Sequence, residues 1–192
     1  MRNVLWAVCG VIIVLVLAAV LFPFSVHDGG RPSLSTQCMR NLSKLGMATE
    51  MYMSEHDYRF PPVKTWNDAL KEPLTRISRS PSDTDKLFIC PSEVNDRSAP
   101  SYAVNARLDG LSERDVADPT YTVRYFESMP GRNLHGGPEL FPPEPRHEMG
   151  YAVCYADGHV GFVPKSEIGK LKWEPQSAKP RSTERPPVGP GG

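Results

Sequence analysis

The chain has 192 residues, enough for one domain of modest size with additional segments at its ends. Its 22 basic and 22 acidic residues give a formal net charge of zero. Because the sequence has neither a cluster of Lys and Arg nor a long acidic tail, its composition argues against binding to nucleic acid.

The N-terminal segment is strongly apolar. Residues 4–22 read VLWAVCGVIIVLVLAAVLF, and as a helix they would cover roughly 28 Å, close to the thickness of a bilayer core. We therefore expect a single-pass transmembrane anchor over residues 1–24, which would contact membrane lipid and place the protein in the cell membrane. The alternative is a cleaved signal peptide, but its apolar region is usually only about 7–15 residues long and a small-residue cleavage site follows it.

Composition divides the rest of the chain into three segments. Residues 25–32 contain two glycines and a proline and are typical of a linker. Residues 173–192 are rich in proline and glycine, with too few apolar side chains to bury a core, so we expect a disordered tail. The folded domain is predicted over residues 33–172, with no internal repeat.

The folded domain is predicted to open with an amphipathic helix. Ser33 or Ser35 can cap it, and apolar residues then recur at spacings of three and four until Pro61 stops the helix. Gly46 lies inside this helix and lowers helix stability by about 1 kcal/mol relative to alanine. This cost indicates that another part of the domain packs closely against the helix at this position.

Short strands are predicted after the helix. The best candidates are residues 101–104, 120–128 and a final hairpin, all rich in Tyr, Val and Phe. One helix followed by several strands predicts an α+β domain in which the helix packs on a small antiparallel sheet with long loops.

The final hairpin contains the most distinctive motif, HEMGYAVCYADGH, residues 147–159. Asp157-Gly158 between two apolar runs predicts a two-residue turn, which would pair Ala156 with His159. His147 would then lie at the far end of the hairpin, on the order of 30 Å from Asp157, too far to share a metal ion. We therefore interpret the motif as structural.

Metal binding elsewhere has weaker support in the sequence. His159 and Asp157 with His135 or Glu127 are ligand types that suit zinc. Oxygen ligands in the loops suit calcium, which is the better candidate of the two, and they come from four acidic residues: Asp109, Glu113, Asp115 and Asp118. No spacing is specific enough to name a metal, so no cofactor is predicted.

The cysteines indicate that the folded domain lies outside the cytoplasm. Cys38 on the helix and Cys90 in the segment FICPSE form a candidate disulfide, and disulfides persist outside the cytoplasm. Such a bridge would contribute roughly 4 kcal/mol through loop closure. The alternative is a pair of free thiols. The sequence contains no nucleophile elbow, phosphate-binding loop, HExxH or CxxC motif, so we expect no enzymatic activity.

Several separated segments together resemble one bacterial family, the prepilin-type processing-associated H-x9-DG proteins, which are related to type II secretion pseudopilins. The segments are C-x-x-N-L-x-x-L-G at residues 38–46, Tyr52 with Phe60-Pro61-Pro62, Cys90-Pro91-Ser92, Ser101-Tyr102 with Asn105, and His147 with Asp157-Gly158-His159. The resemblance covers about residues 38–163.

The resemblance implies a pilin-like fold, an extracytoplasmic location at the cell envelope and no catalytic residues. It also implies contacts with other envelope or pseudopilin-like proteins, as a minor component of, or a scaffold for, a secretion or pilus-like system. The N-terminus departs from the family pattern, because the first glutamate of the chain is Glu50 and no glycine precedes the apolar run. The alternative function is a membrane-tethered module that binds calcium or a glycan in loops 105–145. A membrane-tethered zinc hydrolase would require His147 and Asp157 to meet.

Overall fold

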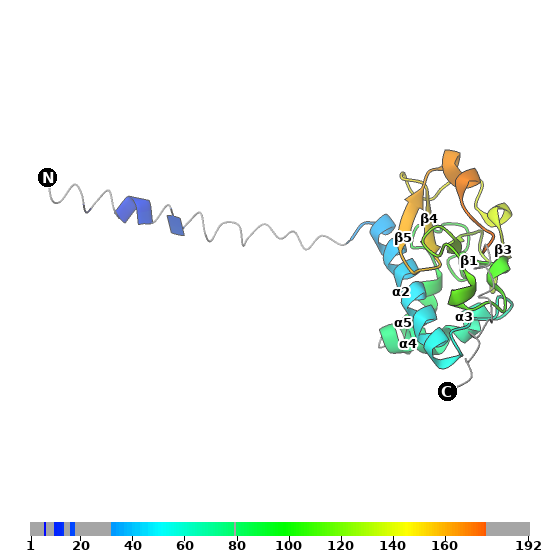
Figure 1. Ribbon diagram of the computed structural model, residues 1–192. Helices are drawn as coiled ribbons and strands as arrows, with labels where there is room; N and C mark the ends of the chain where they lie inside the picture. Colours follow the sequence, from blue (N-terminus) through cyan, green and yellow to red (C-terminus); the bar gives the residue numbers. More distant parts are fainter. Residues whose placement is uncertain (1–5, 7–9, 14–15, 18–31, 79, 176–192) are drawn as a thin grey trace, which may run out of the picture. The chain divides into compact units, whose positions relative to one another are not determined.

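The computed structural model describes residues 6, 10–13, 16–17, 32–78 and 80–175 (Figure 1). The chain divides into two compact units, residues 1–32 and 33–192. The predicted linker falls almost entirely outside the described residues, and so does the predicted disordered tail beyond residue 175.

The expected membrane anchor is contradicted. Across the described residues, none of the helices combines the length and apolar character needed to cross a bilayer. A span requires about 20 consecutive, predominantly apolar residues in one helix. Of the predicted anchor, the structure describes residues 6, 10–13 and 16–17. The prediction of a transmembrane anchor was therefore wrong, and so was the membrane localisation inferred from it.

The first helix of the second unit is α2, Leu34–Glu55. The side-chain oxygen of Ser33 accepts a hydrogen bond from the backbone N–H of Thr36 and caps the helix. Its buried residues follow helical spacing: Cys38, Leu42, Leu45, Gly46, Ala48, Thr49 and Met53. The helix ends before Pro61, as the sequence predicted, and the chain leaves it through Asp57 and Tyr58, both with positive φ.

Three further helices follow α2 in a region where the sequence indicated only strands and loops. They are α3 (Trp66–Ala69), α4 (Lys71–Ser78) and α5 (Pro81–Thr84). The side chain of Trp66 is fully buried and meets the ring of Phe88 edge-on at a centroid distance of 5.7 Å. Short 3₁₀ helices connect the remaining elements: η2 (Asp85–Phe88), η3 (Ala106–Leu108), η4 (Glu113–Asp115) and η5 (Pro138–Leu140), with η6 (Lys165–Lys170) after the last strand.

The sheet has five strands in the order β3-β1-β2-β4-β5. Their bounds are β1 Tyr102–Asn105, β2 Val123–Glu127, β3 His135–Gly136, β4 Tyr151–Tyr155 and β5 Val160–Val163. All neighbouring pairs are antiparallel except β1 and β3, which are parallel. The fold is therefore mixed α/β, and the prediction of a purely antiparallel sheet was wrong because the short strand β3 returns in the direction of β1.

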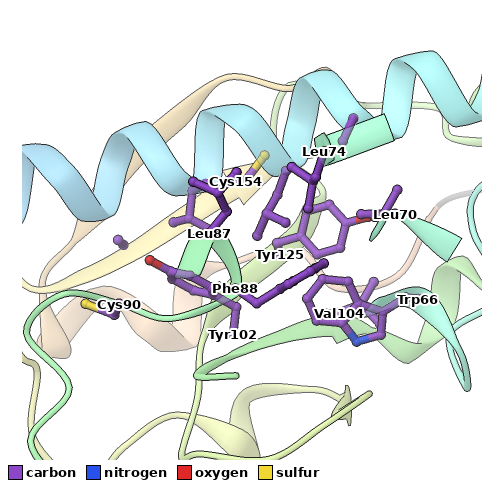
Figure 2. Packing of buried hydrophobic residues seen from close by; sticks show 14 of the residues in the cluster. Trp66, Leu70, Leu74, Leu87, Phe88, Cys90, Tyr102, Val104, Tyr125 and Cys154 are labelled. Atoms are coloured by element: carbon purple, nitrogen blue, oxygen red, sulfur yellow. The ribbon is translucent and has the colours of Figure 1, made fainter. Parts of the chain in front are cut away.

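Helix α2 covers one face of the sheet (Figure 1). Figure 2 shows Leu87, Phe88 and Tyr125 in the core beneath this helix. The opposite face is covered by a second apolar cluster, in which the ring of Trp173 lies 4.9 Å from that of Phe126. Trp173, assigned to the tail from the sequence, thus packs against the folded domain.

The β4–β5 hairpin has a different register from the predicted one. Cys154 pairs with Val160, and the backbone N–H of Tyr155 donates to the carbonyl oxygen of His159. Gly158 has a φ of 89°, but Asp157 does not have a positive φ, so the loop is not the expected two-residue turn. The one-residue shift changes which side chains of β5 face α2, and Val160 and Phe162 pack against the core beneath it.

Gly46 allows α2 to approach the buried guanidinium of Arg124. A Cβ at position 46 would lie 3.3 Å from Arg124 Nη2 and 3.3 Å from the backbone oxygen of Gly158. Arg124 is fully buried at an irregularity in β2, and its Nη1 donates to Glu50 Oε1 at 2.8 Å. The close approach that the sequence indicated is therefore made by an arginine and by the hairpin turn.

We expect Gly46→Ala to lower the free energy of unfolding by about 1 kcal/mol, because crowding against a fixed backbone oxygen outweighs the gain in helix propensity. Urea unfolding measures this change. Met47→Ala is the matched control, since Met47 is the next residue of the helix and is exposed. An increase in stability for Gly46→Ala would contradict the close approach.

Candidate metal centre

Four buried side chains from distant parts of the sequence meet at one end of α2. Cys38 comes from the second turn of that helix, Cys90 from the segment after η2, Glu127 from the last position of β2, and His147 from the loop before β4. Three of them are completely buried, and His147 is 7% exposed. This group of two thiols, a carboxylate and an imidazole could hold a metal ion.

The possible ligand atoms converge on one point. All four lie within 4.8 Å of one another. His147 Nε2 is 3.4 Å from Cys90 Sγ and 3.2 Å from Glu127 Oε1. Cys38 Sγ is 3.6 Å from the same Glu127 oxygen.

The surrounding backbone fixes the positions of these side chains. Cys38 lies on the buried face of α2 because helical spacing places it one turn before Leu42. The backbone N–H of Cys90 donates to the hydroxyl oxygen of Ser101 at 2.7 Å. An isolated bridge between His147 and Gly150 turns the chain into β4, and the imidazole ring lies 5.2 Å from that of Phe162.

A second layer of contacts orients the donors. Glu127 Oε2 accepts a hydrogen bond from the backbone N–H of Ala152 at 2.8 Å, which leaves Oε1 to face the cluster. The hydroxyl of Tyr102 lies 3.1 Å from Cys38 Sγ. The nearly buried guanidinium of Arg146 forms an ion pair with Glu93 and lies 3.8 Å from Glu127 Oε1. Such outer contacts fix the geometry of metal ligands.

The protonation equilibria of the four groups are strongly linked. Burial alone would raise the pKa of Glu127, but hydrogen bonds from His147 and Ala152 outweigh it and lower the pKa. Burial alone would lower the pKa of His147, whereas its contacts with Cys90 and Glu127 raise that pKa to about 9. Interaction with Cys38 lowers the pKa of Cys90 to about 7, while the contact with Cys90 and burial raise the pKa of Cys38. A divalent cation that binds to these four side chains would displace the proton of the His147 imidazolium and the protons of the thiols.

The arrangement does not match a catalytic cysteine–histidine triad. In such a triad one ring nitrogen faces the nucleophile while the other is held by the carboxylate. Here the same atom, His147 Nε2, faces both Cys90 Sγ and Glu127 Oε1. One nitrogen directed at a sulfur and an oxygen, with a second sulfur beside them, is the arrangement expected around a metal ion.

Cys38 and Cys90, the candidate disulfide pair, are both free thiols in this structure. The sequence nevertheless singled out two residues that meet in space. Cys154, the third described cysteine, is also free and lies on β4 near Arg124, outside the cluster.

The other residues of the H-x9-DG motif lie at the hairpin turn. Asp157 Oδ1 accepts from the backbone N–H of His159 at 3.1 Å and lies 2.6 Å from His159 Nδ1. Gly158 completes the turn with its positive φ. His147 and Asp157 therefore flank opposite ends of β4, and the motif does not form one site. Its histidine belongs to the buried cluster and its Asp-Gly to the turn.

The loop residues considered for calcium make separate contacts. Asp109 Oδ1 accepts from the backbone N–H of Val63, Asp115 accepts from Ser112, and Asp118 pairs with Lys172. Over the described part of the chain, only one group of three or more His, Cys, Asp or Glu side chains has donor atoms close enough to share an ion. It consists of Cys38, Cys90, Glu127 and His147. Of His135, Glu127, Asp157 and His159, which the sequence offered as zinc ligands, only Glu127 belongs to it. His147, which was considered for zinc only together with Asp157, belongs to it as well.

Searches for known relatives gave no match: no family model, no curated protein and no solved structure is detectably similar to this chain.

Proposed function

We propose that the domain binds one zinc ion through Cys38, Cys90, Glu127 and His147, and that this ion has a structural role. The convergence of four buried donor atoms is the observation that carries the proposal. Thiolate and imidazole ligands suit zinc, whereas calcium takes oxygen ligands, usually about six to eight of them.

The distances between donors support a tetrahedral ion. With zinc bonds of about 2.3 Å to sulfur and about 2.0–2.1 Å to nitrogen or oxygen, a sulfur lies about 3.5 Å from a nitrogen or oxygen donor, and nitrogen lies about 3.3 Å from oxygen. The observed separations are 3.4 Å and 3.6 Å for the first kind and 3.2 Å for the second. The other three separations among the four donor atoms are at most 4.8 Å, so an ion can bind once these side chains move closer by about 1 Å.

Four protein ligands leave no open position on a tetrahedral zinc ion. Structural zinc sites have this closed form, whereas catalytic sites keep one position for water or substrate. Two thiolates and one carboxylate give the loaded site an overall charge of minus one, and the guanidinium of Arg146 beside Glu127 offsets part of it. We infer that the ion ties α2, the Cys90 segment, β2 and the His147 loop together.

Because a closed zinc site offers no position for substrate, we propose that the ion takes no part in catalysis and that the domain is not an enzyme. Its exposed surface would act through protein–protein contacts, with pilin-like proteins as the partner class that the sequence resemblance implies. The zinc ion would keep the domain rigid for those contacts.

Metal analysis of the purified full-length chain tests this proposal. We expect about one equivalent of zinc per chain, as four protein ligands imply. After replacement by cobalt, the visible spectrum should show intense tetrahedral d–d bands and thiolate charge-transfer absorption. A zinc content near zero after expression in zinc-supplemented medium would refute the proposal, and so would an octahedral cobalt spectrum.

A further inference from the structure

Two of the four proposed ligands are cysteines, and the same two sulfurs can react with each other. Cys38 Sγ and Cys90 Sγ lie within 4.8 Å, and both thiols are free. The two residues belong to segments far apart in the sequence, α2 and the stretch after η2, so a bond between them would be a long-range crosslink.

We propose that the centre is a zinc–disulfide switch, in which a peroxide oxidises Cys38 and Cys90 to a disulfide and releases the zinc ion. This inference rests on the proposed zinc site. It goes further by assigning a class of reactant, hydroperoxides, and a second covalent state to the same residues.

The reaction balances with hydrogen peroxide as the oxidant. The Cys90 sulfur attacks one peroxide oxygen, so that an S–O bond forms, the O–O bond breaks and the hydroxide that leaves is protonated to water. The Cys38 sulfur then attacks the resulting sulfenic acid, the S–S bond forms, and the S–O bond breaks with loss of a second water. Two electrons pass from the two thiolates to the peroxide, two protons come from solvent, and Zn²⁺ loses two of its four ligands.

The lining of one cavity distinguishes Cys90 from Cys38, and on this ground we assign the first attack to Cys90. Cys90 contributes to the lining of a cavity of about 560 Å³ between α2 and the segment that follows η2, together with Asn41, Leu87 and Pro91. Cys38 does not line this cavity and lies on the inner face of α2. Cys90 is itself fully buried, but an oxidant in this cavity lies next to residue Cys90 and not next to Cys38, which is placed to resolve the sulfenic acid.

The backbone around Cys90 can accommodate the change. Cys90 lies outside the helices and strands, between η2 and a turn, so its sulfur can approach Cys38 without breaking a sheet ladder. The contact between His147 Nε2 and Glu127 Oε1, 3.2 Å in this structure, involves neither sulfur, so we expect it to persist after oxidation.

The test uses the reduced, zinc-loaded full-length chain treated with hydrogen peroxide. Zinc release is followed with a chromogenic chelator, and disulfides are mapped by mass spectrometry of unreduced peptides. We expect about one zinc ion released for each disulfide formed, a Cys38–Cys90 linkage, and recovery of zinc binding after reduction. Cys154→Ser is the matched control, because it removes a buried thiol outside the cluster and should change neither readout.

Three outcomes would overturn the switch: zinc that stays bound under peroxide, release with sulfinic acid at Cys90 and no disulfide, or linkage to Cys9 or Cys154. The zinc content of the reduced chain is measured first. A chain without zinc refutes the proposed function and the switch together, whereas a chain that holds zinc but gives one of these three outcomes refutes the switch alone.

Discussion

His147→Ala is expected to abolish stoichiometric zinc binding and to lower the melting temperature by roughly 10 °C. Loss of the imidazole leaves three donors and opens a coordination position. Zinc present at about 1,000 times its Kd stabilises the folded state by about 4 kcal/mol, and each kcal/mol corresponds to about 2–4 °C in a chain of this size. Calorimetry with and without zinc measures the change.

His159→Ala is the matched control for this substitution. His159 is the other histidine of the same motif, but its side chain is 46% exposed at the hairpin turn and stacks on Tyr155. We expect this variant to bind zinc as the wild type does. A zinc-dependent rise in melting temperature that is equal in His147→Ala and wild type would show that His147 acts only through packing against Phe162 and not as a ligand.

Gly150→Ala is expected to lower the free energy of unfolding by roughly 4 kcal/mol, from backbone strain and a steric clash together. Gly150 has a φ of 117°, and a Cβ there would lie 2.1 Å from the backbone oxygen of Val163. Because the backbone fixes the position of the added Cβ and the atom it meets is a backbone oxygen, no side-chain movement relieves the clash. Gly150 also closes the turn that carries His147, so the affinity for zinc should fall as well.

A series of glycine variants separates strain from clash. Gly110 has a φ of 71°, and a Cβ at this position would have no neighbouring atom within 4 Å, so Gly110→Ala should cost only about 1 kcal/mol from strain. Gly161 has neither a positive φ nor a close neighbour, so Gly161→Ala should be nearly neutral. Chemical denaturation of the three variants checks the order. Equal losses for Gly110→Ala and Gly150→Ala would contradict the close packing of Gly150 against the end of β5.

The predicted elements differ in how far the sequence determined them. Helix α2 follows from apolar residues at helical spacing after Ser33, and its buried face was recognisable before the structure. The hairpin at residues 151–163 was also recognisable, but its register was not. Asp-Gly favours a two-residue turn, whereas here only Gly158 adopts a positive φ and the loop is one residue longer. The membrane anchor was predicted from the length of one unbroken apolar run, and it is contradicted because no helix among the described residues is long and apolar enough to cross a membrane.

The sequence indicated the four residues of the candidate metal centre separately and not as one site. Cys38 and Cys90 stood out as a pair, His147 as part of a motif and Glu127 as a ligand type, yet no local spacing connected all four. Their meeting depends on the strand order β1-β2-β4, which places the end of β2 between Tyr102 and Ala152.

The sequence by itself determined the features that depend on a few neighbouring residues: the capped amphipathic helix, the hairpin and the glycine required at its turn. These follow from backbone preferences and from the periodicity of apolar side chains. Only the tertiary structure decided which polar side chains share the interior. That choice depends on packing between α2, the Cys90 segment, β2 and the His147 loop, because buried thiols, a carboxylate and an imidazole need partners that distant segments supply.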